Sequence, residues 1–315
     1  MCLSAVNILK AKKNLEGIVY RTPLTYSQEL SEASGAEVYV KWENLQKTGS
    51  FKLRGAYNKI CCLTPEERAK GIITCSSGNH GLATSLVGKL LGLKVTVVVP
   101  ETAPKVKVKK IKAFGADAIL KGANYDEALI YCKKIAPETG ATYISSFEDY
   151  DVIAGQGTVG CEILEDLPDT ETIIIPTGGG SLLSGIAIWA KTVNPNIKII
   201  GAQSTAAYTM HECFRAKRMV DVPVPPTIAD GLAGGISQLT LDLVLKYVDD
   251  IVLADEEGLK DTILWVLKNE RQIIEGSSAV GHAAILQRKI KFKPSEKVVV
   301  VASGGNIDLE LLGLS

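Results

Sequence analysis

Short apolar or alternating stretches recur along the chain, separated by segments in which apolar residues recur every three or four positions. The first pattern is typical of strands and the second of helices. Strands are predicted at residues 37–42, 71–75, 95–100, 117–120, 142–144, 172–176, 198–202 and 297–302. Helices are predicted at residues 5–16, 56–63, 82–91, 103–114, 124–135, 182–192, 259–275 and 279–289, with two more beginning at Thr64 and after Asp151. Because strands and helices alternate, an α/β fold with parallel sheets is expected.

The order of these elements predicts two lobes. Residues 71–144 repeat a strand–helix unit, so we assign residues 65–148 to a small domain. Residues 1–64 and 149–315 are assigned to a large domain, whose sheet is completed by the N-terminal segment. Residues 221–237 are rich in proline and glycine and are expected to be mostly loop.

Composition narrows the classes of protein to consider. The 315 residues include 35 Lys plus Arg and 35 Asp plus Glu, so the charge balance gives no reason to expect binding to nucleic acid or to an anionic membrane. No run of 18 apolar residues and no secretory signal are present, so we expect no transmembrane helix and a cytoplasmic location. The seven cysteines are scattered without a CxxC pair and are interpreted as reduced thiols.

Three turns of small residues follow predicted strands, at residues 76–81, 177–181 and 303–306. Ligands of open parallel sheets bind at the carboxyl ends of strands. The turn at 177–181 leads from a strand into a helix, an arrangement in which free N–H groups and the helix dipole favour a phosphate. Glycines at such places are also common in tight turns without a ligand.

Lys52 follows a polar, glycine-containing turn and begins a predicted helix. The dipole is positive at that end, which favours the neutral form of the amine. A neutral lysine amine is a nucleophile that can form a Schiff base. The alternative is that Lys52 is an ordinary solvated lysine. The three turns of small residues favour the interpretation of Lys52 as a lysine that forms a Schiff base.

The 177–181 turn lacks the motifs of two common classes of phosphate-binding site, and this narrows the choice of ligand. GxGxxG is not matched, because position 183 is leucine, and Gln203 stands near the place where a dinucleotide site has an acid. No GxxxxGK[ST] motif exists either. A cofactor that uses both a phosphate cradle and a lysine is pyridoxal 5'-phosphate.

In these motifs the sequence resembles the threonine/serine dehydratase and serine racemase group of pyridoxal-phosphate enzymes. This group has fold type II, the fold that it shares with the tryptophan synthase beta chain. The resemblance covers about residues 5–312 and implies two open parallel-sheet lobes and a homo-oligomer, a dimer. The motifs that carry it are Ser50–Ala56, Ser76–His80, Gly178–Leu182 and Ser303–Asn306. The chain ends soon after the fourth motif, so a C-terminal regulatory domain is not expected.

The resemblance also implies roles for individual residues. Lys52 would hold the cofactor and then move the α-proton of an amino-acid substrate, while Phe51 would pack on the pyridine ring. Asn79 would donate to the ring hydroxyl, and Ser303 would meet the pyridine nitrogen. The phosphate would be bound by Gly178, Gly179, Gly180, Ser181 and Leu182.

The substrate carboxylate would be bound by backbone N–H groups of Ser76, Asn79 and His80, with the His80 side chain a bystander. Ser77 is the candidate proton donor on the face opposite Lys52, as in relatives with racemase activity; alternatively it caps the helix that follows. A neutral hydroxyl at Ser303 favours prompt loss of a β-substituent over a long-lived carbanion.

One departure concerns metals. Relatives that bind a divalent cation have acidic residues after the strand at 198–202, whereas here no carboxylate occurs between Gln203 and Glu212. Because hard cations prefer several oxygen ligands, including carboxylates, no metal site is expected. If a cation does bind, Asp230 and Glu275 are the candidate ligands.

The sequence therefore predicts a PLP-dependent ammonia-lyase that converts L-threonine or L-serine to a 2-oxo acid and ammonia. Alternatives are serine racemase, a dehydratase for another hydroxyamino acid such as hydroxyaspartate, a β-replacement enzyme, and a non-catalytic amino-acid sensor. Residues 229–235 and 275–276 resemble a branch of the family that accepts other hydroxyamino acids. An intact Lys52 and Ser303 argue against the sensor.

Overall fold

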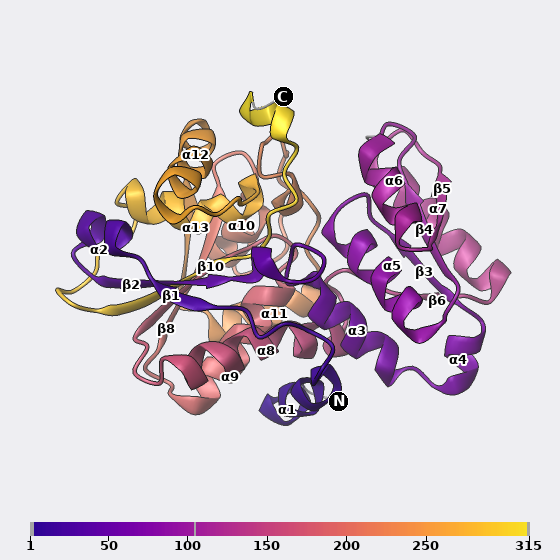
Figure 1. Ribbon diagram of the computed structural model, residues 1–315, viewed down its shortest axis with the longest axis horizontal. Helices are drawn as coiled ribbons and strands as arrows, with labels where there is room; N and C mark the ends of the chain where they lie inside the picture. Colours follow the sequence, from indigo (N-terminus) through magenta and orange to yellow (C-terminus); the bar gives the residue numbers. More distant parts are fainter. Residues whose placement is uncertain (1–2, 104, 314–315) are drawn as a thin grey trace.

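Two sheets organise the chain in the computed structural model, which describes residues 3–103 and 105–313 (Figure 1). The large sheet has six strands in the order β1-β2-β10-β7-β8-β9, and the small sheet has four in the order β5-β4-β3-β6. All neighbours are parallel except β1 and β2, which are antiparallel. The predicted α/β fold with two parallel-sheet lobes is confirmed.

The large sheet combines strands of the N-terminal segment with strands of the second half of the chain. Its strands are β1 (Leu24–Tyr26), β2 (Glu37–Trp42), β7 (Thr172–Pro176), β8 (Lys198–Ser204), β9 (Asp250–Ala254) and β10 (Lys297–Ala302). The helices of the large lobe are α1 (Ala5–Leu15), α2 (Gln28–Ser34), α3 (Lys52–Cys62), α8 (Tyr150–Asp166), α9 (Ser181–Val193), α10 (Thr209–Ala216), α11 (Gln238–Tyr247), α12 (Leu259–Glu270) and α13 (Gly276–Leu286).

Both faces of the large sheet are buried. Alternate residues of a strand point to opposite faces, and in β10 Val298 and Val300 pack with α12 and α13, whereas Val299 and Val301 pack with α8, α9 and α11. This explains why the strand is an unbroken apolar run.

The small lobe lies beside the large one, on the right in Figure 1. Its elements are α4 (Pro65–Ala69), β3 (Ile72–Cys75), α5 (Asn79–Leu91), β4 (Val95–Val99), α6 (Lys105–Ala113), β5 (Asp117–Leu120), α7 (Tyr125–Thr139) and β6 (Thr142–Tyr143). Helix α3 packs against α8 of the large lobe and α5 of the small lobe. The start of α3, where Lys52 lies, is therefore held between the two.

A buried ionic network fixes α3. The Arg54 guanidinium donates to both oxygens of Glu43, at 2.7 and 2.9 Å, and to both oxygens of Glu162, also at 2.7 and 2.9 Å. Lys41 adds a 2.7 Å hydrogen bond to Glu162. Two cations therefore face two carboxylates, which compensates their burial.

One predicted helix is wrong. The apolar spacing predicts a single helix over 259–275, but α12 ends at Glu270 because Arg271 adopts a left-handed conformation with φ +57°. The chain then turns inward, and α13 begins at Gly276 rather than at residue 279. This break brings Glu275 to the N-cap position of α13, next to the cavity described below.

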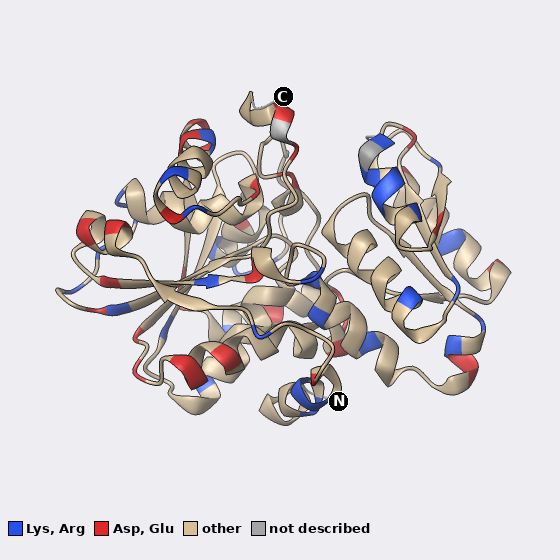
Figure 2. Cartoon of the chain, viewed as in Figure 1, with Lys and Arg blue, Asp and Glu red and all other residues tan. Residues whose placement is uncertain are grey.

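Charges of both signs occur in both lobes (Figure 2), in keeping with the balanced composition. In the described part of the chain, six cysteines are free: Cys75, Cys132, Cys161 and Cys213 are buried, Cys61 is half-buried and Cys62 is exposed. Cys2 lies outside the described residues. None of the described helices has the length and apolar character needed to cross a membrane.

Candidate active site

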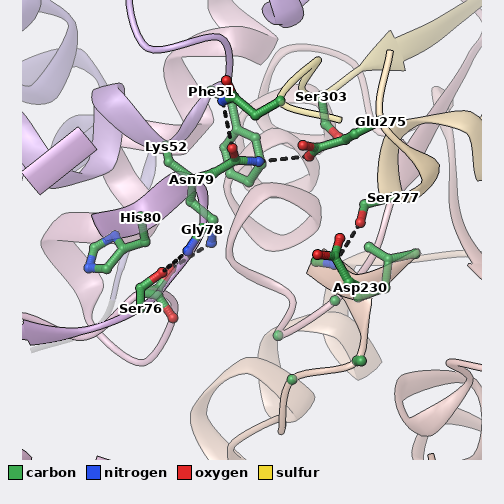
Figure 3. Close-up of a pocket in the computed structure, with 18 of the residues that line it drawn as sticks. Phe51, Lys52, Ser76, Gly78, Asn79, His80, Asp230, Glu275, Ser277 and Ser303 are labelled. Atoms are coloured by element: carbon green, nitrogen blue, oxygen red, sulfur yellow. Dashed lines mark hydrogen bonds between the residues drawn. The ribbon is translucent and has the colours of Figure 1, made fainter. Parts of the chain in front are cut away.

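A cavity of about 370 Å³ is lined by residues of both lobes. Every predicted site residue lines it: Phe51, Lys52, Ser76, Ser77, Asn79, His80, Gly178, Gly179, Gly180, Ser181, Leu182 and Ser303. They come from four segments, each immediately following or beginning a secondary-structure element. The structure thus brings together all four motifs that sequence reasoning singled out, and Figure 3 labels residues of three of them.

Lys52 is the first residue of α3, and its amine reaches the cavity. Nζ donates to Ser146 O at 3.0 Å and lies 5.0 Å from the centroid of the Phe51 ring. Burial lowers the pKa of Lys52 to about 8, and the nearby Glu275 carboxyl opposes this. Burial is therefore the main reason why the Lys52 amine loses its proton more easily, whereas the sequence analysis named the helix dipole as the cause.

The Gly178–Gly180 turn begins α9. Gly180 has φ +89° and is the N-cap residue, with no side-chain cap. An added Cβ would lie 2.8 Å from Met210 Cε, so the position requires glycine both for conformation and for space. The Ser184 amide donates to Gly180 O at 2.9 Å, leaving the amides of the first turn for an anion.

A second helix N-terminus faces the same cavity. Helix α5 begins at Asn79, and its N-cap residue is Gly78, again without a side-chain cap. Ser77 is therefore not the cap, and that alternative is wrong. Ser76 Oγ instead accepts from the Gly78 amide at 3.2 Å. The Ser76 amide donates to Val98 O at 3.2 Å, so it is already used and does not have the predicted role in binding the substrate carboxylate. The first amides of α5 point toward a position where a carboxylate would be favoured.

His80 is fully enclosed. Its Nε2 lies 3.3 Å from Ile144 O, and because a carbonyl oxygen only accepts, this nitrogen carries the proton. Burial, together with the positive charge of Lys52, lowers the pKa of His80 to about 3. The imidazole is therefore neutral near pH 7 and is not an acid there.

Asn79 belongs to a chain of hydrogen bonds (Figure 3). Its Nδ2 donates to Glu275 Oε1 at 2.7 Å, and its Oδ1 accepts from Asn306 Nδ2 at 2.8 Å. One N–H of the Asn79 amide is left over. The geometry is compatible with the expected donation to a cofactor hydroxyl.

Sequence reasoning missed several cavity residues. Lys107 of α6 and Asp230, which begins a short 3₁₀ turn (Asp230–Leu232), form an ion pair of 3.2 Å between the lobes. Asp230 and Glu275 had been considered as metal ligands and as parts of the segments 229–235 and 275–276, whereas Lys107, Tyr125 and Ser146 had no assigned role. These last three do not lie in a glycine-rich turn, which was the signal used to find the others.

Gln203 lies in the segment that has no carboxylate before Glu212, and it has a neutral amide whose two ends are both hydrogen-bonded. Nε2 donates to Thr177 O at 2.9 Å, and Oε1 accepts from the His211 amide at 2.7 Å. Across the described residues, no group of three or more His, Cys, Asp or Glu side chains is arranged to hold a metal ion.

An enclosed lysine, a glycine-rich anion cradle and a second helix N-terminus in one cavity define an enzyme that binds a phosphate-bearing aldehyde and a small carboxylate. Lys52 supplies the amine for the aldehyde, the start of α9 fits its phosphate, and Ser303 lies at the end of β10 on the cavity wall. These residues fit pyridoxal phosphate.

Comparison with known proteins identifies the group. Residues 15–304 match the family described as pyridoxal-phosphate dependent enzyme. An L-threonine ammonia-lyase of Thermotoga maritima is 45% identical over 97% of this chain and 76% of its own length. A catabolic L-threonine dehydratase of Staphylococcus aureus is 42% identical over 98% of this chain and 90% of its own length. The structure of maize serine racemase superposes with a TM-score of 0.95 at 35% identity, covering 99% of this chain and 96% of the other.

The chain belongs to the pyridoxal-phosphate-dependent enzyme family. The predicted family, fold type and cofactor are confirmed.

Proposed function

We propose that the protein is an ammonia-lyase that converts L-threonine to 2-oxobutanoate and ammonia, and L-serine to pyruvate and ammonia. The observation that carries this is the position of the Lys52 amine in one cavity with two uncapped helix N-termini, one suited to a phosphate and one to a carboxylate. The names of the relatives from Thermotoga maritima and Staphylococcus aureus support the choice of substrate.

Pyridoxal phosphate, when bound, withdraws electrons from the substrate α-carbon and so makes its proton acidic. The amides from Gly178 to Leu182, in the turn before α9 and at its start, would hold the phosphate, and Ser303 would meet the ring nitrogen. The amides at the start of α5 bind the substrate carboxylate and orient its α-carbon toward Lys52. Lys52 Nζ then takes the α-proton, because its pKa near 8 leaves part of the amine neutral.

Loss of the β-hydroxyl follows removal of the α-proton. The Ser303 hydroxyl is neutral and does not add a positive charge at the ring, which shortens the lifetime of negative charge on the α-carbon. A short lifetime favours elimination. The 2-oxo acid and ammonia are formed once the product takes up water.

The test is 2-oxo acid and ammonia production from L-threonine and L-serine, with Lys52→Ala as the variant. We expect both products from the parent, and from the variant neither product nor the visible absorbance of lysine-bound cofactor. Products from Lys52→Ala at the parental rate would overturn the assignment. Release of a new amino acid only when sulfide is added would indicate β-replacement instead.

Serine racemisation is a second candidate activity of the same cavity. Ser77 lines the cavity but does not cap α5, so its hydroxyl is free of that task. The similarity to maize serine racemase is compatible with this activity. Hydroxyaspartate belongs in the substrate screen too, because Lys107 and Lys110 bring two cations to the cavity wall.

We also propose a homodimer in the cytoplasm. The free cysteines of the described chain suit a reducing compartment. Val6 and Leu9 of α1 are 59% and 50% exposed, an apolar surface of the kind that subunits cover. Light scattering during size-exclusion chromatography measures the mass; a monomer at micromolar concentration would contradict the dimer.

A further inference from the structure

Glu275 lies at the wall between two cavities. It lines the catalytic cavity and also a neighbouring one of about 520 Å³, which Thr227, Glu256 and Asp308 help to line. The side chain is only 8% exposed. A buried carboxyl group is costly unless it is neutral or well bonded, so its position calls for an explanation.

The contacts of Glu275 lead directly to the cofactor side of the cavity. Oε1 accepts from Asn79 Nδ2 at 2.7 Å, while Asn306 Nδ2 donates to Asn79 Oδ1 at 2.8 Å and to Thr48 O at 2.7 Å. The Asn79 amide is thus held in one orientation, with its oxygen toward Asn306 and one N–H toward Glu275. Only its other N–H remains for a cofactor oxygen.

Gly304 makes this arrangement possible. A Cβ at that position would lie 2.6 Å from Glu275 Oε1 and 3.2 Å from Asn79 Nδ2. The Glu275 amide also donates to Gly304 O at 3.0 Å. The absence of a side chain in the turn after β10 therefore leaves room for the Glu275 carboxyl group to contact the Asn79 amide.

Charged groups face Glu275 from three elements. Asp230 of the 3₁₀ turn disfavours its ionised form, Lys107 of α6 favours it, and Lys52 of α3 lies close enough for the two charges to interact. Burial is the largest influence and raises the pKa of Glu275 to about 7, with Asp230 adding to it. In turn, the Glu275 charge raises the pKa of Lys52.

We propose that Glu275 is a positioning residue: its carboxyl group orients the Asn79 amide toward the cofactor and places a titratable charge on the wall of the same cavity as the Lys52 amine. The inference rests on the proposed function only in that Lys52 carries the cofactor; it does not depend on which amino acid is the substrate.

The first test uses cofactor-free protein and infrared difference spectroscopy of buried carboxyl groups. In the parent, a protonated carboxyl band should disappear with a midpoint near pH 7, and Glu275→Gln should lack it. The control is Glu270→Gln, which removes a half-buried carboxyl group that accepts from Ser27 Oγ and lines neither cavity. A parent without a band near pH 7, or a band lost in Glu270→Gln instead, would overturn the proposal.

The second test measures covalent capture of pyridoxal phosphate by cofactor-free protein. The neutral Lys52 amine condenses with the aldehyde and releases water, so the pH dependence of the rate reports the amine pKa. In Glu275→Gln the midpoint should lie lower by about 1 pH unit, because a nearby opposite charge has been removed. Glu270→Gln should match the parent. Identical midpoints in parent and Glu275→Gln would refute the coupling.

Glu275→Asp separates the two parts of the proposal and serves if the glutamine variant does not fold. The shorter side chain keeps the charge but withdraws it from Asn79. We expect the infrared band to persist, while the affinity for pyridoxal phosphate falls by about tenfold, roughly the loss of one hydrogen bond to a charged group. Unchanged affinity would show that the Asn79 contact has no positioning role. Absence of lyase activity in the parent, with these results intact, would count against the proposed substrate alone.

Discussion

Arg54 and Glu162 form a double hydrogen bond inside the protein, with NH1–Oε1 at 2.7 Å and NH2–Oε2 at 2.9 Å. The pair joins α3, two residues from Lys52, to the C-terminal half of α8. Because Arg54 is fully buried, removing it leaves two carboxylates without their main partner. The network that positions the reactive lysine is therefore also a determinant of stability.

Arg54→Met should lower the free energy of unfolding by about 3–5 kcal/mol, the usual cost of leaving buried charge uncompensated. Urea unfolding followed by circular dichroism measures it. Arg21→Met is the control, since Arg21 is 49% exposed where it pairs with Glu165 and Asp166, and such a pair contributes about 0–1 kcal/mol. Equal losses in the two variants would contradict the role given to burial.

Gly180→Ala should weaken cofactor binding more than it weakens the fold. The added methyl group imposes strain at φ +89° and crowds Met210, and it does so at the start of the phosphate cradle. We expect the dissociation constant for pyridoxal phosphate, measured by absorbance titration, to rise by about tenfold or more. Gly35→Ala is the control, because Gly35 also has a positive φ, +75°, but has nothing within 4 Å of the added atom and lies outside the phosphate-binding turn. This variant should have similar backbone strain and bind the cofactor normally.

Burial of Glu275 predicts how the stability of the cofactor-free protein varies with pH. The folded state binds the Glu275 proton more tightly, with a pKa of about 7 against an ordinary value of 4.5. The stabilisation is therefore complete below pH 4.5 and is lost as the pH rises through 7, with a total of about 3 kcal/mol. Urea unfolding between pH 4.5 and 8 should show this fall in the difference between the parent and Glu275→Gln, because groups such as His80, whose lowered pKa makes stability rise with pH, contribute equally to both proteins. Glu257→Gln, at an exposed position, should follow the parent.

Most of the site could be predicted from the sequence, because its motifs lie at the ends of buried strands where apolar runs give way to glycine and serine. The Gly178–Ser181 turn and Ser303 are examples: each follows an unbroken apolar strand. Gly180 has a left-handed backbone, and an added Cβ would lie 2.9 Å from Gly231 O at Gly178 and 2.5 Å from Phe147 Cγ at Gly179. These requirements for glycine leave a local trace in the sequence.

Glu275 could not be found in the same way. Residues 259–275 have continuous helical spacing, and the break comes from Arg271, which carries no glycine or proline signal. The partner of Glu275 is Asn79, 196 residues away, and their contact depends on how the lobes pack. The edge strand β9 (Asp250–Ala254) was missed for a related reason: it is short and half-buried.

Chelation should not abolish activity. Gln203 lies in a segment without a carboxylate before Glu212, and both ends of its amide are already hydrogen-bonded. We expect the initial rate with L-threonine to change by less than about twofold after EDTA treatment, since no hard-cation ligand set is available at that position. A large loss that magnesium or calcium restores would contradict this and direct attention to Asp230 and Glu275.

Ser77→Ala should remove any racemisation while sparing elimination. Racemisation needs a proton donor on the side of the α-carbon opposite Lys52, and Ser77 lines the cavity in the segment that binds the substrate carboxylate. Because the neutral Ser303 favours rapid elimination, D-serine should form more slowly than pyruvate. Chiral chromatography after incubation with L-serine measures it. We expect D-serine from the parent, none from Ser77→Ala, and pyruvate from both. A parent that forms no D-serine would rule out a proton-donating role for Ser77 and leave it only as part of the carboxylate-binding turn.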